Sequence, residues 1–88
     1  MNVFTLKQQA LAKVEEAYVA AEAHYGRKFT RVPVEFSKAQ KVTAGTAHWR
    51  RTHTGYTPTK IKLSLPLLML NGDTFIEETP GHEAAHLI

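Results

Sequence analysis

The sequence contains no cysteine. This absence excludes disulfide bonds and zinc sites built on thiolates, and it is typical of proteins in a reducing compartment. Long hydrophobic runs are also missing, because the longest apolar stretch, residues 65–70, is far shorter than the roughly 20 residues of a membrane-spanning helix. The first residues lack the basic stretch and apolar core of a signal peptide. These absences predict a cytoplasmic protein with no membrane partner.

The length of the chain limits its hydrophobic core. With 88 residues, the chain is near the lower limit for a domain that can bury a self-sufficient core. This length excludes a second domain. We therefore expect residues 1–88 to form one domain.

Acidic residues are nearly missing from the middle of the chain. Between residues 27 and 62, nine lysines and arginines stand against Glu35 alone, which gives this block a net charge of +8. Residues 1–26 and 63–88 carry net charges of −1 and −4. The basic block predicts contact with nucleic acid or another polyanion, although a solvated sheet face would give the same count.

Four residues of this block are candidates for contact with DNA: Arg50, Arg51, Lys60 and Lys62. Arg50 and Arg51 directly follow Trp49, and an aromatic ring beside cations is typical of surfaces that stack bases and bind phosphates of single-stranded DNA. Side chains alternate between the two faces of a strand. This alternation favours Trp49 on the core face, with only part of the basic set on the outer face.

The apolar periodicity predicts an α+β fold. A period of three to four residues indicates an N-terminal helix that begins with a capping box at Thr5 and Gln8 and ends at Gly26. The period then changes to two, and Pro33 favours an edge position for the first strand. Strands are predicted over residues 32–36, 43–49, 51–56 and 61–65. Because no helix separates them, we expect a small antiparallel sheet of three or four strands.

The last third of the chain returns to helix. Pro66 predicts a short helical turn after the last strand, and Asn71 with Gly72 predicts a break. A second long helix should begin with Asp73 as its N-cap. Pro80 and Gly81 interrupt this helix in sequence and predict a bend or a fresh helical start before residue 82.

This predicted helix carries the strongest motif, His82-Glu83-Ala84-Ala85-His86. Residues i and i+4 share a helix face, so His82 and His86 can bind one Zn²⁺ while Glu83 acts as general base on an activated water. A catalytic zinc usually needs three protein ligands, and none follows the motif. His48 and His53 are alternative third ligands. Chance alone produces the motif in roughly one chain of fifty with this composition, and the two histidines would then merely face solvent.

Three segments carry a family resemblance beyond the motif: residues 43–47, residues 61–68 and residues 75–88. Their order resembles that of the SprT-like zinc metallopeptidases, in which a glycine-containing strand, a strand ending in Ile-x-Leu-Asn-Pro, a short helical turn and the motif helix follow one another. The resemblance is close over residues 30–88 and covers the N-terminal helix in outline. Ser64-Leu65-Pro66 stands where the family often has Leu-Asn-Pro, which alters a polar contact in the turn.

The resemblance implies a minigluzincin-like zincin core, truncated after the motif helix, with His82 and His86 as zinc ligands and Glu83 as catalytic acid and base. It also implies a third ligand on a following helix, which has no counterpart here. We therefore expect a zinc-dependent endopeptidase acting on protein or peptide substrates, inactive in this 88-residue form. The family further implies DNA-associated substrates. The alternatives are a non-catalytic DNA-binding module that uses the basic sheet, and a homodimer that covers the exposed truncated surface.

Overall fold

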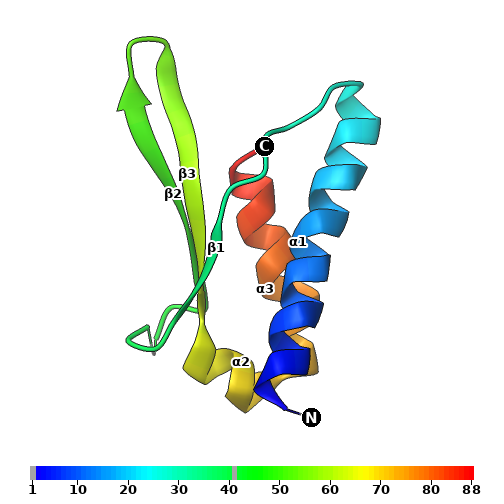
Figure 1. Cartoon of the computed structure of the whole chain (residues 1–88), viewed down its shortest axis with the longest axis vertical. Helices are drawn as coiled ribbons and strands as arrows, with labels where there is room; N and C mark the ends of the chain where they lie inside the picture. Colours follow the sequence, from blue (N-terminus) through cyan, green and yellow to red (C-terminus); the bar gives the residue numbers. More distant parts are fainter. Residues whose placement is uncertain (1, 41) are drawn as a thin grey trace.

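The computed structural model describes residues 2–40 and 42–88 of the chain. Its elements follow in the order α1 (Val3–Tyr25), β1 (Val34–Ser37), β2 (Gly45–Thr52), β3 (Gly55–Ser64), α2 (Leu65–Asn71) and α3 (Asp73–His86) (Figure 1). The predicted α+β class and the order of helix, sheet and helix are confirmed. No helix in these two ranges is long and apolar enough to cross a membrane.

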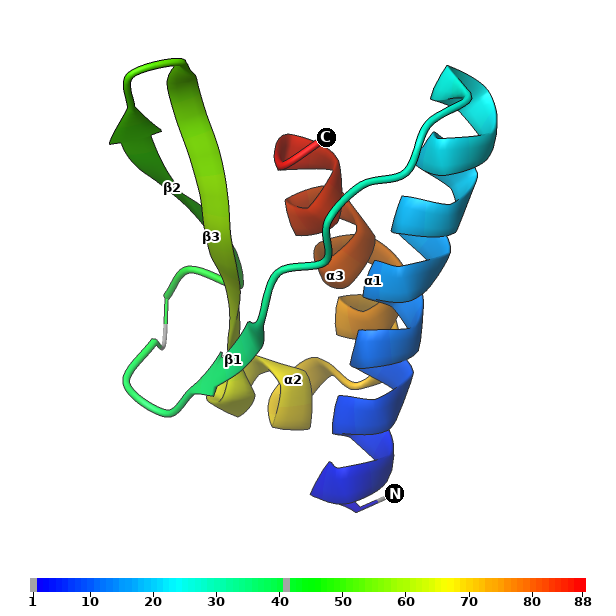
Figure 2. The same cartoon turned by 45° about the horizontal axis from the view of Figure 1, so that its top comes forward.

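The elements form two layers. Helices α1 and α3 lie side by side on one face of the sheet, and α2 joins the end of β3 to α3 (Figures 1 and 2). The buried apolar core comprises Leu6, Ala10, Val14, Tyr18, Ile61, Leu63, Leu68, Phe75, Ile76, Ala84 and Leu87. The other face of the sheet carries no helix among the described residues, so it is open to solvent.

The ends of α1 follow ordinary capping chemistry. The N-cap is Asn2 rather than the predicted Thr5, because the Asn2 side chain accepts a hydrogen bond of 2.8 Å from the Thr5 backbone N–H. Asparagine caps helices at least as well as threonine, so the helix gains a turn. The predicted end at Gly26 is confirmed: this residue has a φ of 68° and donates its N–H to the Glu22 carbonyl.

The sheet is mixed, whereas the sequence predicted a purely antiparallel sheet. Its strand order is β1-β3-β2, with β3 antiparallel to β2 but parallel to β1. The chain reverses direction after β1 and again after β2, so β1 and β3 run the same way. The central position of β3 makes them neighbours, and it buries Ile61 and Leu63 completely. Pro33 precedes β1 at the sheet edge, as predicted.

The predicted division of the hairpin is wrong. β2 continues through Arg50 to Thr52 without a break, and β3 joins two segments that were predicted as separate strands. The chain turns instead before Gly55, whose φ of 127° strongly favours glycine. β3 also tolerates Pro58. The pairing register of β2 and β3 shifts between His48 and Trp49, and Pro58 is the partner of Trp49. A proline, which has no N–H to donate, is accommodated at such an irregularity.

The turn between β3 and α2 confirms the predicted helical start at the proline. Ser64 is the N-cap of α2: its hydroxyl accepts a hydrogen bond from the Leu67 N–H at 3.2 Å and donates one to the Gln40 carbonyl. The predicted break after α2 is also confirmed, because Gly72 has a φ of 52°. Asp73, however, is not an N-cap. It lies in the first turn of α3, where its charge still favours the helix dipole.

Helix α3 runs through Pro80 without the predicted fresh start. Proline cannot donate to the preceding turn, which normally bends or ends a helix. Pro80 is fully buried, and burial of its apolar ring offsets part of this cost. The motif residues therefore lie on the same continuous helix as the buried residues Phe75 and Ile76.

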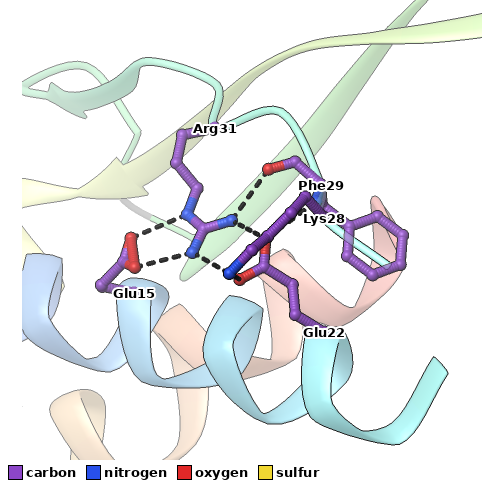
Figure 3. Close-up of polar contacts among 5 residues, drawn as sticks. All are labelled: Glu15, Glu22, Lys28, Phe29 and Arg31. Carbon is purple, nitrogen blue, oxygen red and sulfur yellow. Dashed lines mark hydrogen bonds and ion pairs between the residues drawn. The ribbon is translucent and has the colours of Figure 1, made fainter. Parts of the chain in front are cut away.

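An arginine fixes the segment between α1 and β1 onto α1. The Arg31 guanidinium forms ion pairs with Glu15 at 2.7 Å and Glu22 at 2.6 Å, and it donates to the Phe29 carbonyl (Figure 3). Glu22 in turn accepts from the Phe29 N–H at 2.8 Å. Hydrogen bonds from Arg31 and from the Phe29 backbone lower the pKa of Glu22 to about 2.

This cluster predicts a loss of stability in acid. The folded-state pKa of Glu22 is depressed below its ordinary 4.5, so its stabilising contribution is complete above pH 4.5 and falls as the pH drops toward 2. We expect Glu22→Gln to lower the free energy of unfolding near neutral pH, with the difference from wild type shrinking between pH 4.5 and 2. Urea unfolding at several pH values measures this. Glu16→Gln, which removes an exposed carboxyl 3.7 Å from Lys13, is the control, and an equal difference at all pH values would contradict the assignment.

Candidate metal centre

The two motif histidines converge at the end of α3. His82 and His86 lie on successive turns, and their Nε2 atoms are 3.0 Å apart. The ring centroids are 4.6 Å apart, with the ring planes almost perpendicular. Both side chains are exposed. The two imidazoles therefore lie on the same face of the helix, as predicted.

The distance between these nitrogens fits a shared zinc ion. A tetrahedral zinc with Zn–N bonds of 2.0–2.1 Å separates two ligand nitrogens by about 3.3 Å. The observed 3.0 Å reaches this value with a small rotation of either ring. Neutral imidazole is also a common zinc ligand. His82 and His86 are thus chemically and geometrically suitable as two of the ligands.

A third ligand is missing from the described residues. No group of three or more His, Cys, Asp or Glu side chains is close enough to hold a metal ion within residues 2–40 and 42–88. His48 lies on β2 and makes a 2.9 Å hydrogen bond with Thr46. His53 is exposed in the turn between β2 and β3. Neither alternative ligand is therefore brought to the histidine pair.

Glu83 packs against the neighbouring strand. Its side chain is mostly buried, and a Cβ atom added to Gly45 would lie only 2.8 Å from Glu83 Cγ and 3.0 Å from Thr79 Cγ2. Any residue other than glycine at this point of β2 would push the glutamate away. Gly45 and Thr79 were not among the predicted site residues. A contact between a strand and a helix 34 or more residues away leaves no local pattern, and only the glycine in the family signature pointed to it.

A cleft of about 300 Å³ opens beside the glutamate. It is lined by Glu83 and His86 from α3 and by Ala47 and Trp49 from β2, among others. β2 pairs with β3 alone among the described strands, so its other edge presents unpaired backbone groups. A glutamate, an imidazole and an open strand edge therefore surround one space. Such a site can bind an extended peptide and transfer a proton.

The basic candidates divide between the two faces of the sheet. Lys60 and Lys62 pair with His48 and Thr46 of β2, and alternation puts Arg50 on that same outer face. Arg51 lies two residues after Trp49 and so shares its face of the strand, and Trp49 lines the cleft on the helix side. The prediction that only part of the set faces outward agrees with this arrangement. Trp49 is still 46% exposed, because it lies at the rim of the core.

Comparison with known proteins identifies the family. The sequence model of the SprT-like family matches residues 8–88. The chain is 32% identical to Protein SprT of Shewanella oneidensis, with 94% of this chain and 48% of that protein covered. It is 32% identical to Protein SprT of Pseudomonas putida and 30% identical to that of Shigella boydii, in each case covering 94% of this chain and 46% of the relative.

These relatives are longer proteins. The chain spans about half the length of the relatives that it matches. No solved structure matches the chain. The match of the family model over most of the sequence agrees with the resemblance carried by the glycine strand, the proline turn and the motif helix. The chain belongs to the SprT-like family.

Proposed function

We propose that this protein is the N-terminal part of a zinc-dependent endopeptidase of the SprT-like type. The observation that carries the proposal is the position of Glu83, which lines a cleft together with His86 and residues of β2. A general base must reach the substrate, and this cleft is open to it. The expected substrate is a protein or peptide, and the expected location is the cytoplasm.

In the proposed mechanism, His82 and His86, whose Nε2 atoms face each other, would hold a zinc ion. Zinc, when bound, polarises the scissile carbonyl and lowers the pKa of water. The Glu83 carboxylate accepts the proton of the attacking water and then donates it to the leaving amine. The edge of β2 holds the peptide backbone extended, because its unpaired N–H and C=O groups can add a strand.

We propose that the third zinc ligand comes from outside these 88 residues. The relatives are about twice as long, and the family resemblance implies a ligand on a helix after the motif. Two imidazoles are one ligand short of the three protein ligands that a catalytic zinc usually has. We therefore propose that the 88-residue form has no measurable peptidase activity.

A homodimer that covers its exposed surface is a further proposal, which a measurement of the molecular mass in solution tests.

The first test is zinc binding by the 88-residue chain. Complete structural zinc sites contribute about 10–16 kcal/mol, and half of such a ligand set corresponds to a dissociation constant in the micromolar range or weaker. Calorimetry should show such weak binding. His82→Ala should abolish it, whereas His86→Ala should reduce it less, because His86 is the last residue of α3 and its helix end frays.

His53→Ala is the matched control for zinc binding. His53 is exposed in the hairpin turn, so its removal should leave the dissociation constant unchanged. Tight stoichiometric binding by the wild-type chain would contradict the two-ligand site. It would instead point to His48, His53 or a second molecule as the source of an additional ligand.

A DNA-binding module is the second candidate function. The observation that favours it is the outer face of the sheet, which no described helix covers. Arg50, Lys60 and Lys62 share this face. The Glu35 carboxylate lies 3.5 Å from the Lys60 ammonium group and partly offsets the positive charge of this face. This surface can contact a phosphate backbone without reading its sequence.

Salt dependence tests the DNA proposal. Phosphate contacts release counterions, so each contact with single-stranded DNA contributes about 0.7 to the slope of log affinity against log salt. We expect Arg50→Gln with Lys62→Gln to weaken binding and to reduce this slope by about 1.4. Fluorescence anisotropy with a short oligonucleotide at several salt concentrations measures both. His82→Ala should change neither, and absence of binding at low salt would remove this function.

A further inference from the structure

A second cleft of about 570 Å³ adjoins the candidate metal centre. It lies between the end of α1, the segment that follows it, the distal part of the β2-β3 hairpin and the end of α3. Trp49 and His86 line both this cleft and the smaller one beside Glu83. The two clefts therefore meet at these side chains. A peptide lying along β2 past Glu83 would extend a neighbouring side chain into the larger cleft.

The charged side chains that line the larger cleft are cationic. Arg27 and Lys28 line it, and no carboxylate side chain does so in the described part of the chain. The Lys28 side chain is 93% exposed, and its ion pair with Glu22 is long at 4.0 Å. Glu22 itself is bound by Arg31 at 2.6 Å. The charge of Lys28 is therefore available to another anion.

The cationic segment is also held in place. The Arg27 guanidinium lies over the Phe29 ring, 4.6 Å from its centroid. The backbone of Phe29 is bound on both sides, because its N–H donates to Glu22 and its carbonyl accepts from Arg31 (Figure 3). A segment fixed in this way loses little conformational entropy when a ligand binds beside it.

We propose that this cleft binds an acidic side chain of the peptide substrate, with Arg27 and Lys28 as the residues that determine this specificity. The proposal rests on the peptidase function proposed above and names its substrate class. Two cations suit one carboxylate. A nucleic acid needs a longer basic track, and the other candidate cations, Lys60 and Lys62, lie on the opposite face of the sheet.

The single tryptophan gives a direct measurement. Trp49 is the only tryptophan of the chain and lines the cleft, so its fluorescence should change when a peptide binds. We would titrate the 88-residue chain with blocked hexapeptides that carry Glu, Gln or Lys at one central position. At low salt, the Glu peptide should bind about fivefold more tightly than the Gln peptide, the size expected for exposed ion pairs. The Lys peptide should bind most weakly.

Two matched variants locate the effect. Arg27→Gln with Lys28→Gln should bind the Glu and Gln peptides equally. Lys60→Gln with Lys62→Gln removes the same charge from the outer sheet face and should keep the fivefold preference. Equal binding of the two peptides by the wild-type chain would overturn the proposal, as would loss of the preference in both variants. A single-stranded oligonucleotide that displaces the Glu peptide and requires Arg27 and Lys28 would assign the cleft to nucleic acid instead.

These titrations are independent of the peptidase proposal, because they need neither zinc nor cleavage. The protein could prefer the Glu peptide and yet cleave no peptide, even when extended to the length of its relatives. This result would rule out the proposed peptidase function but not the acidic specificity of the cleft. Cleavage by the extended protein without a preference for acidic peptides would rule out the acidic specificity of the cleft but not the peptidase function.

Discussion

Glu83→Gln should abolish peptide cleavage in a chimera in which the C-terminal half of the Shewanella oneidensis SprT protein follows Ile88. Glutamine has the same shape as glutamate but cannot accept a proton, so the variant should lose the general base and little else. Removal of a general base typically costs about 10²–10⁴ in rate. Cleavage of an unfolded protein substrate, followed by gel electrophoresis, measures this loss.

Zinc content separates loss of the base from loss of the metal. Glu83 packs against β2, and the contact between His82 and His86 does not involve it. The chimera with Glu83→Gln should therefore bind as much zinc as its parent, whereas His82→Ala should lose both zinc and activity. Cleavage by the Glu83→Gln chimera at the parental rate would show that Glu83 is not the base.

Gly45→Ala should destabilise the protein and displace the glutamate, although it adds one methyl group. The new Cβ would lie 2.8 Å from Glu83 Cγ and 3.2 Å from Leu63 Cδ2. Overpacking of this kind costs about 1–3 kcal/mol. In the chimera, a shift of about 1 Å at a catalytic group can lower the rate by about 10²-fold. Urea unfolding of the 88-residue chain and cleavage by the chimera measure the two effects.

Gly81→Ala is the control for this substitution. Gly81 lies in the same helix as Glu83, its φ is not positive, and a Cβ there meets nothing within 4 Å. Alanine at such a helical position stabilises by about 0.5–1 kcal/mol. The two glycine substitutions should therefore change the free energy of unfolding in opposite directions. Equal effects would mean that the close contact between β2 and α3 does not govern the site.

The sequence by itself determined the features that depend on near neighbours in the chain. The end of α1 at Gly26 and the break at Gly72 follow from the backbone freedom of glycine, so local residues predict them. The facing of His82 and His86 follows from helix geometry alone. The first cap was misassigned even so, because Asn2 and Thr5 are comparable caps three residues apart.

The tertiary structure decided what depends on distant residues. Whether β1 pairs with β2 or β3 depends on which strand is most deeply buried, and the burial of Ile61 and Leu63 puts β3 in the centre. The same packing brings Gly45 against Glu83. Hydrophobic burial is not directional, so a sequence pattern can show which residues are buried but not which of them meet.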